Sequence, residues 1–149
     1  MLTSNETVTL PYTKDQLCDL VADVEKYPEF LPWCNKCKVI KKNSPTHFFA
    51  ELEVSYKNFK KSYVSEVIIT KGELENTIDV VMVKGPFKKL VNNWKFVNLE
   101  GQSELSFFIK LELKSMVMQA LLKSLFSNAY KKMVKAFIDR ADEVFATNS

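Results

Sequence analysis

The sequence of 149 residues is 46% hydrophobic and 26% charged, and its 21 basic and 18 acidic side chains give a formal net charge of +3. This length and composition predict one domain, residues 1–149, with an apolar core of its own and no room for a second full domain. The odd number of cysteines, three, argues against a disulfide framework, and a single arginine, Arg140, argues against recognition of DNA.

Two kinds of targeting segment are not expected. The longest nearly apolar stretch, 116–126, is too short and too often interrupted to span a bilayer. The first ten residues have no basic group ahead of an apolar run, so they do not resemble a secretory signal. We therefore expect a cytoplasmic protein, and clustered lysines would suit contact with the inner face of the membrane.

The first predicted elements are a short strand at 7–10 and a helix that begins after Thr13. Thr13 and Gln16 fit a capping box, and apolar residues then recur at helical spacing as far as Val24. The segment that follows holds Pro28 and Pro32 with large apolar residues between them, a pattern that indicates a short helical turn.

The rest of the chain predicts a sheet and one long helix. From Lys38 to Lys114 polar and apolar residues alternate, and turn signals divide the segment into six strands, which must be antiparallel because their connections are short. From Ser115 to Phe145 there is neither glycine nor proline, and apolar residues recur at helical spacing. The predicted fold class is α+β, with about seven antiparallel strands wrapped around a long C-terminal helix, in the order strand, helix, short helix, six strands, helix.

Few residues are candidates for catalysis or metal binding. The single histidine, His47, begins a strand on its polar side, and no paired carboxylates or glycine-rich phosphate loop occur. Cys34 and Cys37 have the spacing of metal and redox motifs, but residues three apart on a regular strand point to opposite faces, so we expect no site there. We predict no catalytic residue, no metal and no catalytic cofactor.

The amount of bulky apolar material indicates a different kind of site. The chain has 11 Phe, 5 Tyr, 2 Trp and 5 Met for one sheet and one helix. A long curved sheet around a single helix tends to leave unfilled space, which apolar side chains with few polar groups would make suitable for an apolar ligand. We therefore expect a hollow domain.

Two motifs then point to a family. Residues 20–34, LVADVEKYPEFLPWC, closely resemble the signature of the coenzyme Q-binding START-like family, and residues 85–90, GPFKKL, followed by Trp94-Lys95-Phe96, resemble its second motif. This family belongs to the polyketide cyclase and Bet v 1-like superfamily. The resemblance covers nearly the whole chain and implies the helix-grip fold, in agreement with the order of elements predicted above.

The resemblance also implies a function. One branch of the family binds ubiquinone and supports respiration, and the other is described as a bacterial toxin that blocks association of ribosomal subunits. Trp33 in the triplet Pro32-Trp33-Cys34 is typical of the respiratory branch. The resemblance thus implies non-enzymatic binding or chaperoning of ubiquinone, or of a similar isoprenoid lipid, in support of electron transport or quinone biosynthesis.

The ligand-binding residues that we expect fall into three groups. By the family motifs, an entrance segment and a cavity wall would be formed by Phe30, Leu31, Pro32 and Trp33 and by Phe87, Trp94 and Phe96. Our own inference from helix geometry adds Met118, Leu122, Leu125 and Phe126.

Two alternatives stay open from the sequence. Clusters of lysines, among them Lys36, Lys38 and Lys41, would suit ribosomal RNA and thus the toxin-like function. A cyclase-like enzyme is the other alternative, with less support because no catalytic constellation is present.

Overall fold

The structure is a computed structural model and describes residues 2–56 and 59–146. In chain order the elements are β1 (Leu2–Leu10), α1 (Lys14–Ala22), the 3₁₀ helix η1 (Val24–Glu29), β2 (Cys34–Ser44), β3 (His47–Tyr56), β4 (Phe59–Lys71), β5 (Glu75–Lys84), β6 (Lys89–Leu99), β7 (Gln102–Glu112) and α2 (Met116–Phe145). The strands form one antiparallel sheet in the order β1-β7-β6-β5-β4-β3-β2. The predicted fold class and order of elements are confirmed, and β1 is longer than the predicted strand.

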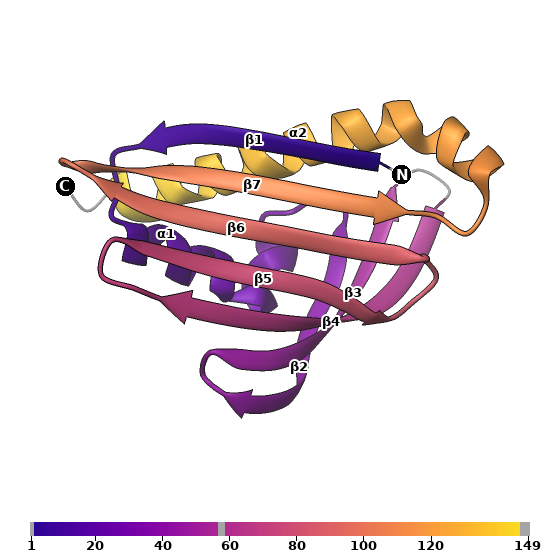
Figure 1. The fold of residues 1–149 in the computed structure, drawn as a ribbon, viewed down its shortest axis with the longest axis horizontal. Coiled ribbons are helices and arrows are strands. Elements are labelled where there is room, and N and C mark those ends of the chain that lie inside the picture. The colour runs from indigo at the N-terminus through magenta and orange to yellow at the C-terminus, as the bar shows by residue number, and fades with distance from the viewer. Residues whose placement is uncertain (1, 57–58, 147–149) are drawn as a thin grey trace.

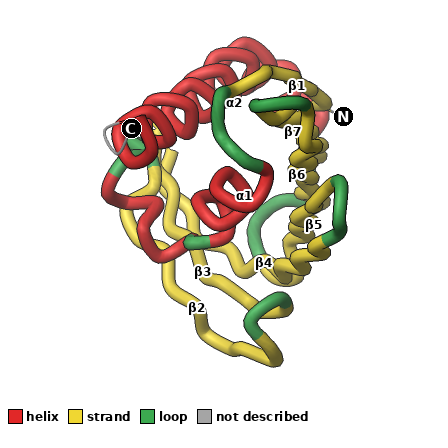
Figure 2. The backbone as a smooth tube through the Cα atoms, turned by 90° about the vertical axis from the view of Figure 1, so that its left-hand side faces the viewer, coloured by secondary structure: helices red, strands yellow, loops and turns green. Residues whose placement is uncertain are grey.

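The sheet is curved, and both helices lie on its concave side (Figures 1 and 2). Figure 2 shows α1 in the middle of the curve and α2 along the side that the sheet leaves open. The fully buried core residues Leu17, Ile78, Phe96 and Phe107 come from α1 and from the inward faces of the strands. The core is therefore concentrated at the end of the sheet where α1 lies.

The start of α1 follows the predicted capping box. The Gln16 amide N–H donates to Thr13 Oγ1 at 3.1 Å, and the Thr13 N–H donates to Gln16 Oε1 at 2.9 Å. The helix ends at Ala22, and the helical turn that follows is η1. The sequence indicated this turn between Pro28 and Pro32, whereas η1 lies mostly before that segment and reaches it only at Glu29.

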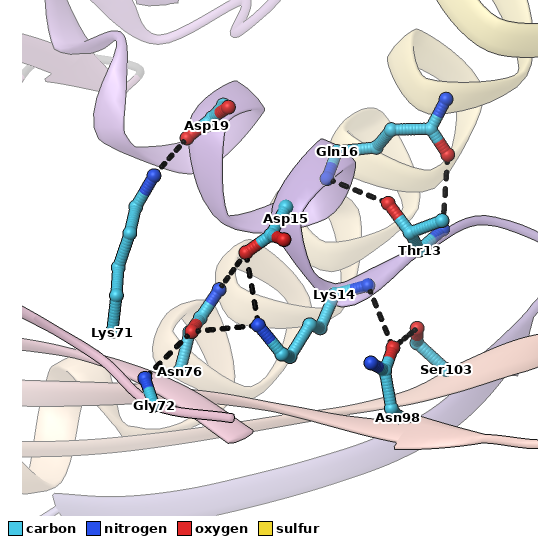
Figure 3. A network of polar contacts seen from close by, with 10 residues as sticks. All are labelled: Thr13, Lys14, Asp15, Gln16, Asp19, Lys71, Gly72, Asn76, Asn98 and Ser103. Carbon is cyan, nitrogen blue, oxygen red and sulfur yellow. Dashed lines mark hydrogen bonds and ion pairs between the residues drawn. The ribbon is translucent and has the colours of Figure 1, made fainter. Parts of the chain in front are cut away.

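A polar network fixes α1 to the sheet (Figure 3). Lys14 Nζ lies 3.0 Å from Asp15 Oδ1 and 3.3 Å from Asn76 Oδ1, and the Asn76 amide donates to Asp15 at 2.8 Å. Asn76 is fully buried, so these partners replace the water that it loses on folding. An ion pair of 2.9 Å between Lys71 and Asp19 adds a second connection. This end of the domain is thus closed by α1 and held by hydrogen bonds.

The long helix α2 begins with the predicted cap, in which the Met118 N–H donates to Ser115 Oγ at 3.3 Å. Its second half contributes Val134, Phe137 and Ala141 to the core. Its first turns are exposed, with exposed fractions of 88% for Met116 and 66% for Leu121. Among the described residues, no helix has both the length and the apolar character needed to cross a membrane.

Candidate functional site

A cavity of about 270 Å³ lies between the concave face of the sheet and α2. Its floor is formed by inward residues of β3 to β7, its roof by α2, and one side by α1, η1 and the segment leading into β2. The volume is close to the lower end of the range of about 300 to 1,000 Å³ for small-molecule sites. The cavity confirms the expectation of a hollow domain.

The cavity has a closed end and a more open end. Along β7 the lining residues pass from buried Phe107 to half-buried Leu111, and along α2 they pass from buried Phe137 to half-buried Phe126. Both series run from the end where α1 lies towards the end where α2 begins (Figure 1). A ligand therefore has its easiest access near the start of α2.

The wall is apolar, with a few uncharged polar groups. Among the described residues, no aspartate, glutamate, lysine, arginine or histidine lines it. The polar side chains include Tyr63 and Ser65 on β4 and Asn92 on β6. Burial raises the pKa of Tyr63 well above its usual range, so its phenol stays neutral and protonated. The cavity can therefore hold an uncharged ligand that is mostly hydrocarbon.

Tyr27 connects the cavity wall to the backbone of α1. Its hydroxyl donates to the backbone carbonyl of Val21, and its ring packs edge-on against Phe137 with the ring centroids 5.3 Å apart. Burial raises the pKa of this phenol as well. The η1 helix is thus locked between α1 and α2 next to the cavity.

Some of the residues expected at the site lie on the cavity wall. The expected residues that line it are Leu31 and Trp33 from the entrance segment, Phe87 and Trp94 from the second motif, and Phe126 from α2. Tyr63 and Phe87 also contact each other with their ring centroids 6.0 Å apart. These residues come from four separate parts of the chain, and the fold brings them together around one space.

The other residues named from the sequence do not line this cavity. Phe96 is fully buried beside Trp94, with the rings stacked and the centroids 6.4 Å apart, so it belongs to the packed core. Phe30 packs on Phe137 at 5.1 Å between centroids, and Pro32 is exposed. Three α2 residues lie beyond the described wall near the exposed start of the helix, Met118, Leu122 and Leu125. The spacing of apolar residues along α2 identifies its apolar face, but it does not show which part of that face the sheet covers.

Cys34 and Cys37 do not point to opposite faces of the sheet, as regular strand geometry predicted. Cys34 and Cys37 are both buried, because a β-bulge between Cys34 and Lys36 adds a residue to β2 and returns Cys37 to the inner face. Burial raises the pKa of Cys34 to about 11 and that of Cys37 to about 12, so both remain thiols at neutral pH. Neither cysteine is therefore in the thiolate form that metal binding or thiol–disulfide exchange requires.

His47 has an ordinary surface partner. Its Nε2 lies 2.7 Å from Glu66 Oε2 on the neighbouring strand, and both side chains are partly exposed. Across the described parts of the chain, no three side chains of the types His, Cys, Asp and Glu come together in a way that could hold a metal ion.

The polar groups of the wall were not predicted from the sequence. Ser65 lies between Tyr63 and Val67, and Asn92 lies between Leu90 and Trp94, each on the inward register of its strand. A polar residue at an inward position of an otherwise apolar face is the signal that could have identified them.

A curved antiparallel sheet that holds a long helix over an apolar cavity defines the helix-grip class. The chain belongs to the family described as polyketide cyclase / dehydrase and lipid transport, whose model matches residues 10–138. The superfamily suggested by the two motifs is thereby confirmed.

Relatives carry two different names. The chain is 38% identical over 146 residues to the ribosome association toxin RatA of Rickettsia prowazekii, covering 97% of this chain and 99% of that protein. It is 30% identical over 153 residues to the mitochondrial coenzyme Q-binding protein COQ10 of Dictyostelium discoideum, covering 100% of this chain and 73% of that protein. These identities do not support the preference for the respiratory branch that Trp33 suggested.

The fold itself has a close structural match. A START superfamily protein from Mycobacterium smegmatis superposes with a TM-score of 0.80, covering 95% of this chain and 98% of that chain, at 21% identity. At this level of identity the match shows the fold alone.

Proposed function

We propose that the protein binds an uncharged isoprenoid lipid, of the ubiquinone kind, in the cavity and carries it without making or breaking bonds. The observation that carries the proposal is an apolar cavity, closed at one end and open at the other, whose described wall has no charged side chain. Burial of apolar ligand surface at about 25 cal/mol per Å² would supply the affinity. The relative named as a coenzyme Q-binding protein supports the choice of ligand.

The size of the cavity supports a partial enclosure of such a lipid. A volume of about 270 Å³ is small for a small-molecule site, so a long polyprenyl tail would extend beyond it. The exposed start of α2 offers apolar surface at the more open end, through Met116, Val117 and Leu121. The tail would leave the cavity there.

The same end of the molecule suits the surface of an anionic bilayer. Lys114 precedes α2, and Lys88 lies at the adjoining end of the sheet, where its backbone N–H donates to the Glu112 carbonyl at 2.9 Å. Lysines near an anionic membrane contribute roughly 1 kcal/mol each. Apolar side chains with Lys88 and Lys114 nearby at the cavity entrance would allow a lipid to pass between bilayer and protein.

The test is to identify what the purified protein carries. The protein is isolated from a quinone-producing host, extracted with organic solvent, and the extract is analysed by mass spectrometry. We expect stoichiometric quinone or a related isoprenoid lipid. If the extract is free of such lipids and decylubiquinone added to the protein leaves the fluorescence of Trp33 and Trp94 unchanged, the proposal is wrong.

A second candidate function is interference with ribosomal subunit association, which the relative named as a ribosome association toxin favours. The edge strand β2 carries three exposed lysines that do not line the cavity, Lys36, Lys38 and Lys41. Sucrose-gradient sedimentation of ribosomes with the protein tests this function. A shift towards separate subunits that is lost when these three lysines become glutamate would support it.

A further inference from the structure

The hydroxyl of Ser65 is an unusual group for the place it occupies. Ser65 is 1% exposed and lies on β4, where it is one of the residues that line the cavity. Among the described residues, this Oγ has no hydrogen-bond partner. Its neighbours on the adjoining strands are Ala50 and Met82, which offer no side-chain acceptor of ordinary strength. A buried hydroxyl without a partner costs folding free energy, so this position is better suited to a bound ligand than to the empty protein.

A second polar group faces the same space. Asn92 pairs with Val80, and Val80 pairs with Val67, the next inward residue after Ser65 on β4. Asn92 therefore lies two strands away from Ser65 on the same face of the sheet and two residues along, at about 12 Å for a strand spacing of about 4.8 Å and a rise of about 3.3 Å per residue. One ring that carries oxygens on opposite edges would span this separation with a hydrogen bond at each edge.

The charge of the wall limits what these two groups can recognise. Because no charged side chain of the described residues lines the cavity, a phosphate or carboxylate head would be buried there without a counter-charge. The ligand group that meets Ser65 must therefore be neutral, and it must accept a hydrogen bond, as a carbonyl, ether or hydroxyl oxygen does.

We propose that the ligand enters head first, so that a neutral ring oxygen accepts a hydrogen bond from Ser65 Oγ deep in the cavity and the hydrocarbon tail runs towards the start of α2. This inference rests on the proposed function. It adds the orientation of the ligand and the side chain that donates a hydrogen bond to its head group. Asn92 takes the opposite edge of the ring.

The gradient of burial supports this orientation. Ser65 is 1% exposed, and Tyr63, two residues nearer the open end on the same strand, is half-buried. A tail placed at the closed end instead would leave the Ser65 hydroxyl against hydrocarbon, still without a hydrogen-bond partner.

The test compares two ligands with the same tail. Decylubiquinone carries ring oxygens, and decylbenzene carries none. Ser65→Ala is the variant, and Ser103→Ala is its matched control, because Ser103 on β7 is equally buried but lies outside the cavity wall, where its hydroxyl donates to Asn98 at 3.4 Å. Binding of decylubiquinone is measured by the change in tryptophan fluorescence. Binding of decylbenzene is measured by its ability to displace bound decylubiquinone.

We expect Ser65→Ala to weaken decylubiquinone binding by about three- to tenfold, the usual range for one neutral hydrogen bond, and to leave decylbenzene binding unchanged. The unliganded variant should melt at the same temperature as the wild type or higher, because it removes an unpaired buried hydroxyl. Ser103→Ala should change neither affinity by more than about twofold.

Three results would overturn the inference. If Ser65→Ala leaves decylubiquinone affinity unchanged while both ligands bind, the head lies elsewhere and the proposed function stands. If the variant weakens both ligands equally or melts well below the wild type, Ser65 serves packing. If neither ligand binds the wild-type protein, the proposed function and this orientation both fall.

Discussion

The guanidinium of Arg140 lies over the ring of Phe30, with the central carbon 5.1 Å from the ring centroid. Arg140 also pairs with Glu29 at 3.0 Å, so the only arginine of the chain joins α2 to the segment that leads into the cavity wall. Cation–π contacts of partly desolvated arginines contribute about 0.5 to 2 kcal/mol. This relationship fixes the position of the segment that carries Leu31 and Trp33.

The first prediction concerns this contact. Arg140→Met keeps most of the aliphatic stem and removes the charge, so we expect the free energy of unfolding to fall by about 1 to 2 kcal/mol in urea denaturation. Lys135→Met is the control, because the ion pair of Lys135 with Asp139 at 2.7 Å is exposed, and it should cost less than about 0.5 kcal/mol. Equal effects of the two substitutions would show that the contact with Phe30 contributes little.

The second prediction separates the cavity wall from the core. Phe96→Ala removes a fully buried ring and should lower the free energy of unfolding by about 3 to 5 kcal/mol. Trp33→Ala removes a half-buried wall residue and should cost less stability but reduce decylubiquinone affinity at least fivefold. Urea denaturation and fluorescence titration measure the two effects. A variant Trp33→Ala that binds as well as the wild type would remove this residue from the site.

The predicted elements show what periodicity can and cannot reveal. The caps at Thr13 and Ser115, the alternating strands and the long helix were predicted because each depends on residues close together in sequence. The bulge in β2 was not predicted, because an extra residue in one strand leaves no trace in its composition. The placement of Met118 and Leu122 outside the wall depends on where the sheet ends, which is a tertiary property. Ser65 was missed because a lone serine in a strand resembles ordinary solvent-facing alternation.

The third prediction concerns the polar network at the closed end. Asn76→Ala removes the buried amide that accepts from the Gly72 N–H at 3.2 Å and from Lys14 at 3.3 Å. Because Lys14 is itself buried, its ammonium would lose a partner, and we expect a loss of about 2 to 3 kcal/mol in the free energy of unfolding. Asn93→Ala, which removes an exposed amide bonded to Asp79, should cost less than about 1 kcal/mol and serves as the control.

The fourth prediction is a dependence on pH from the same network. The hydrogen bond from Asn76, and then that from Lys14, hold the pKa of Asp15 below its usual range. A carboxyl with a lowered pKa in the folded protein stabilises it above the unfolded pKa of about 3.9, and this contribution is lost as the pH falls through the folded value. Asp15→Asn should therefore make stability less dependent on pH below about 4, as measured by urea denaturation at several pH values. An unchanged pH profile would contradict the assignment to Asp15.

The fifth prediction concerns the exposed start of α2. Leu121→Asp should reduce binding to vesicles that contain anionic phospholipid, because Leu121 lies at the more open end of the cavity and is 66% exposed. Leu74→Asp is the matched control, since Leu74 is 71% exposed but lies in the turn between β4 and β5 near α1. Vesicle co-sedimentation measures both. If the two substitutions have the same effect, the start of α2 has no special role at the bilayer.

The bulge in β2 has a chemical consequence for the proposed quinone ligand. Quinones are electrophiles, and thiolates attack them by conjugate addition, whereas protonated thiols react slowly. Cys34 forms part of the cavity wall, and the bulge keeps its neighbour Cys37 on the same apolar side, where burial raises both pKa values to about 11 and about 12. The sulfur atoms would thus lie beside the proposed ligand without being alkylated by it, and the ligand would leave unchanged.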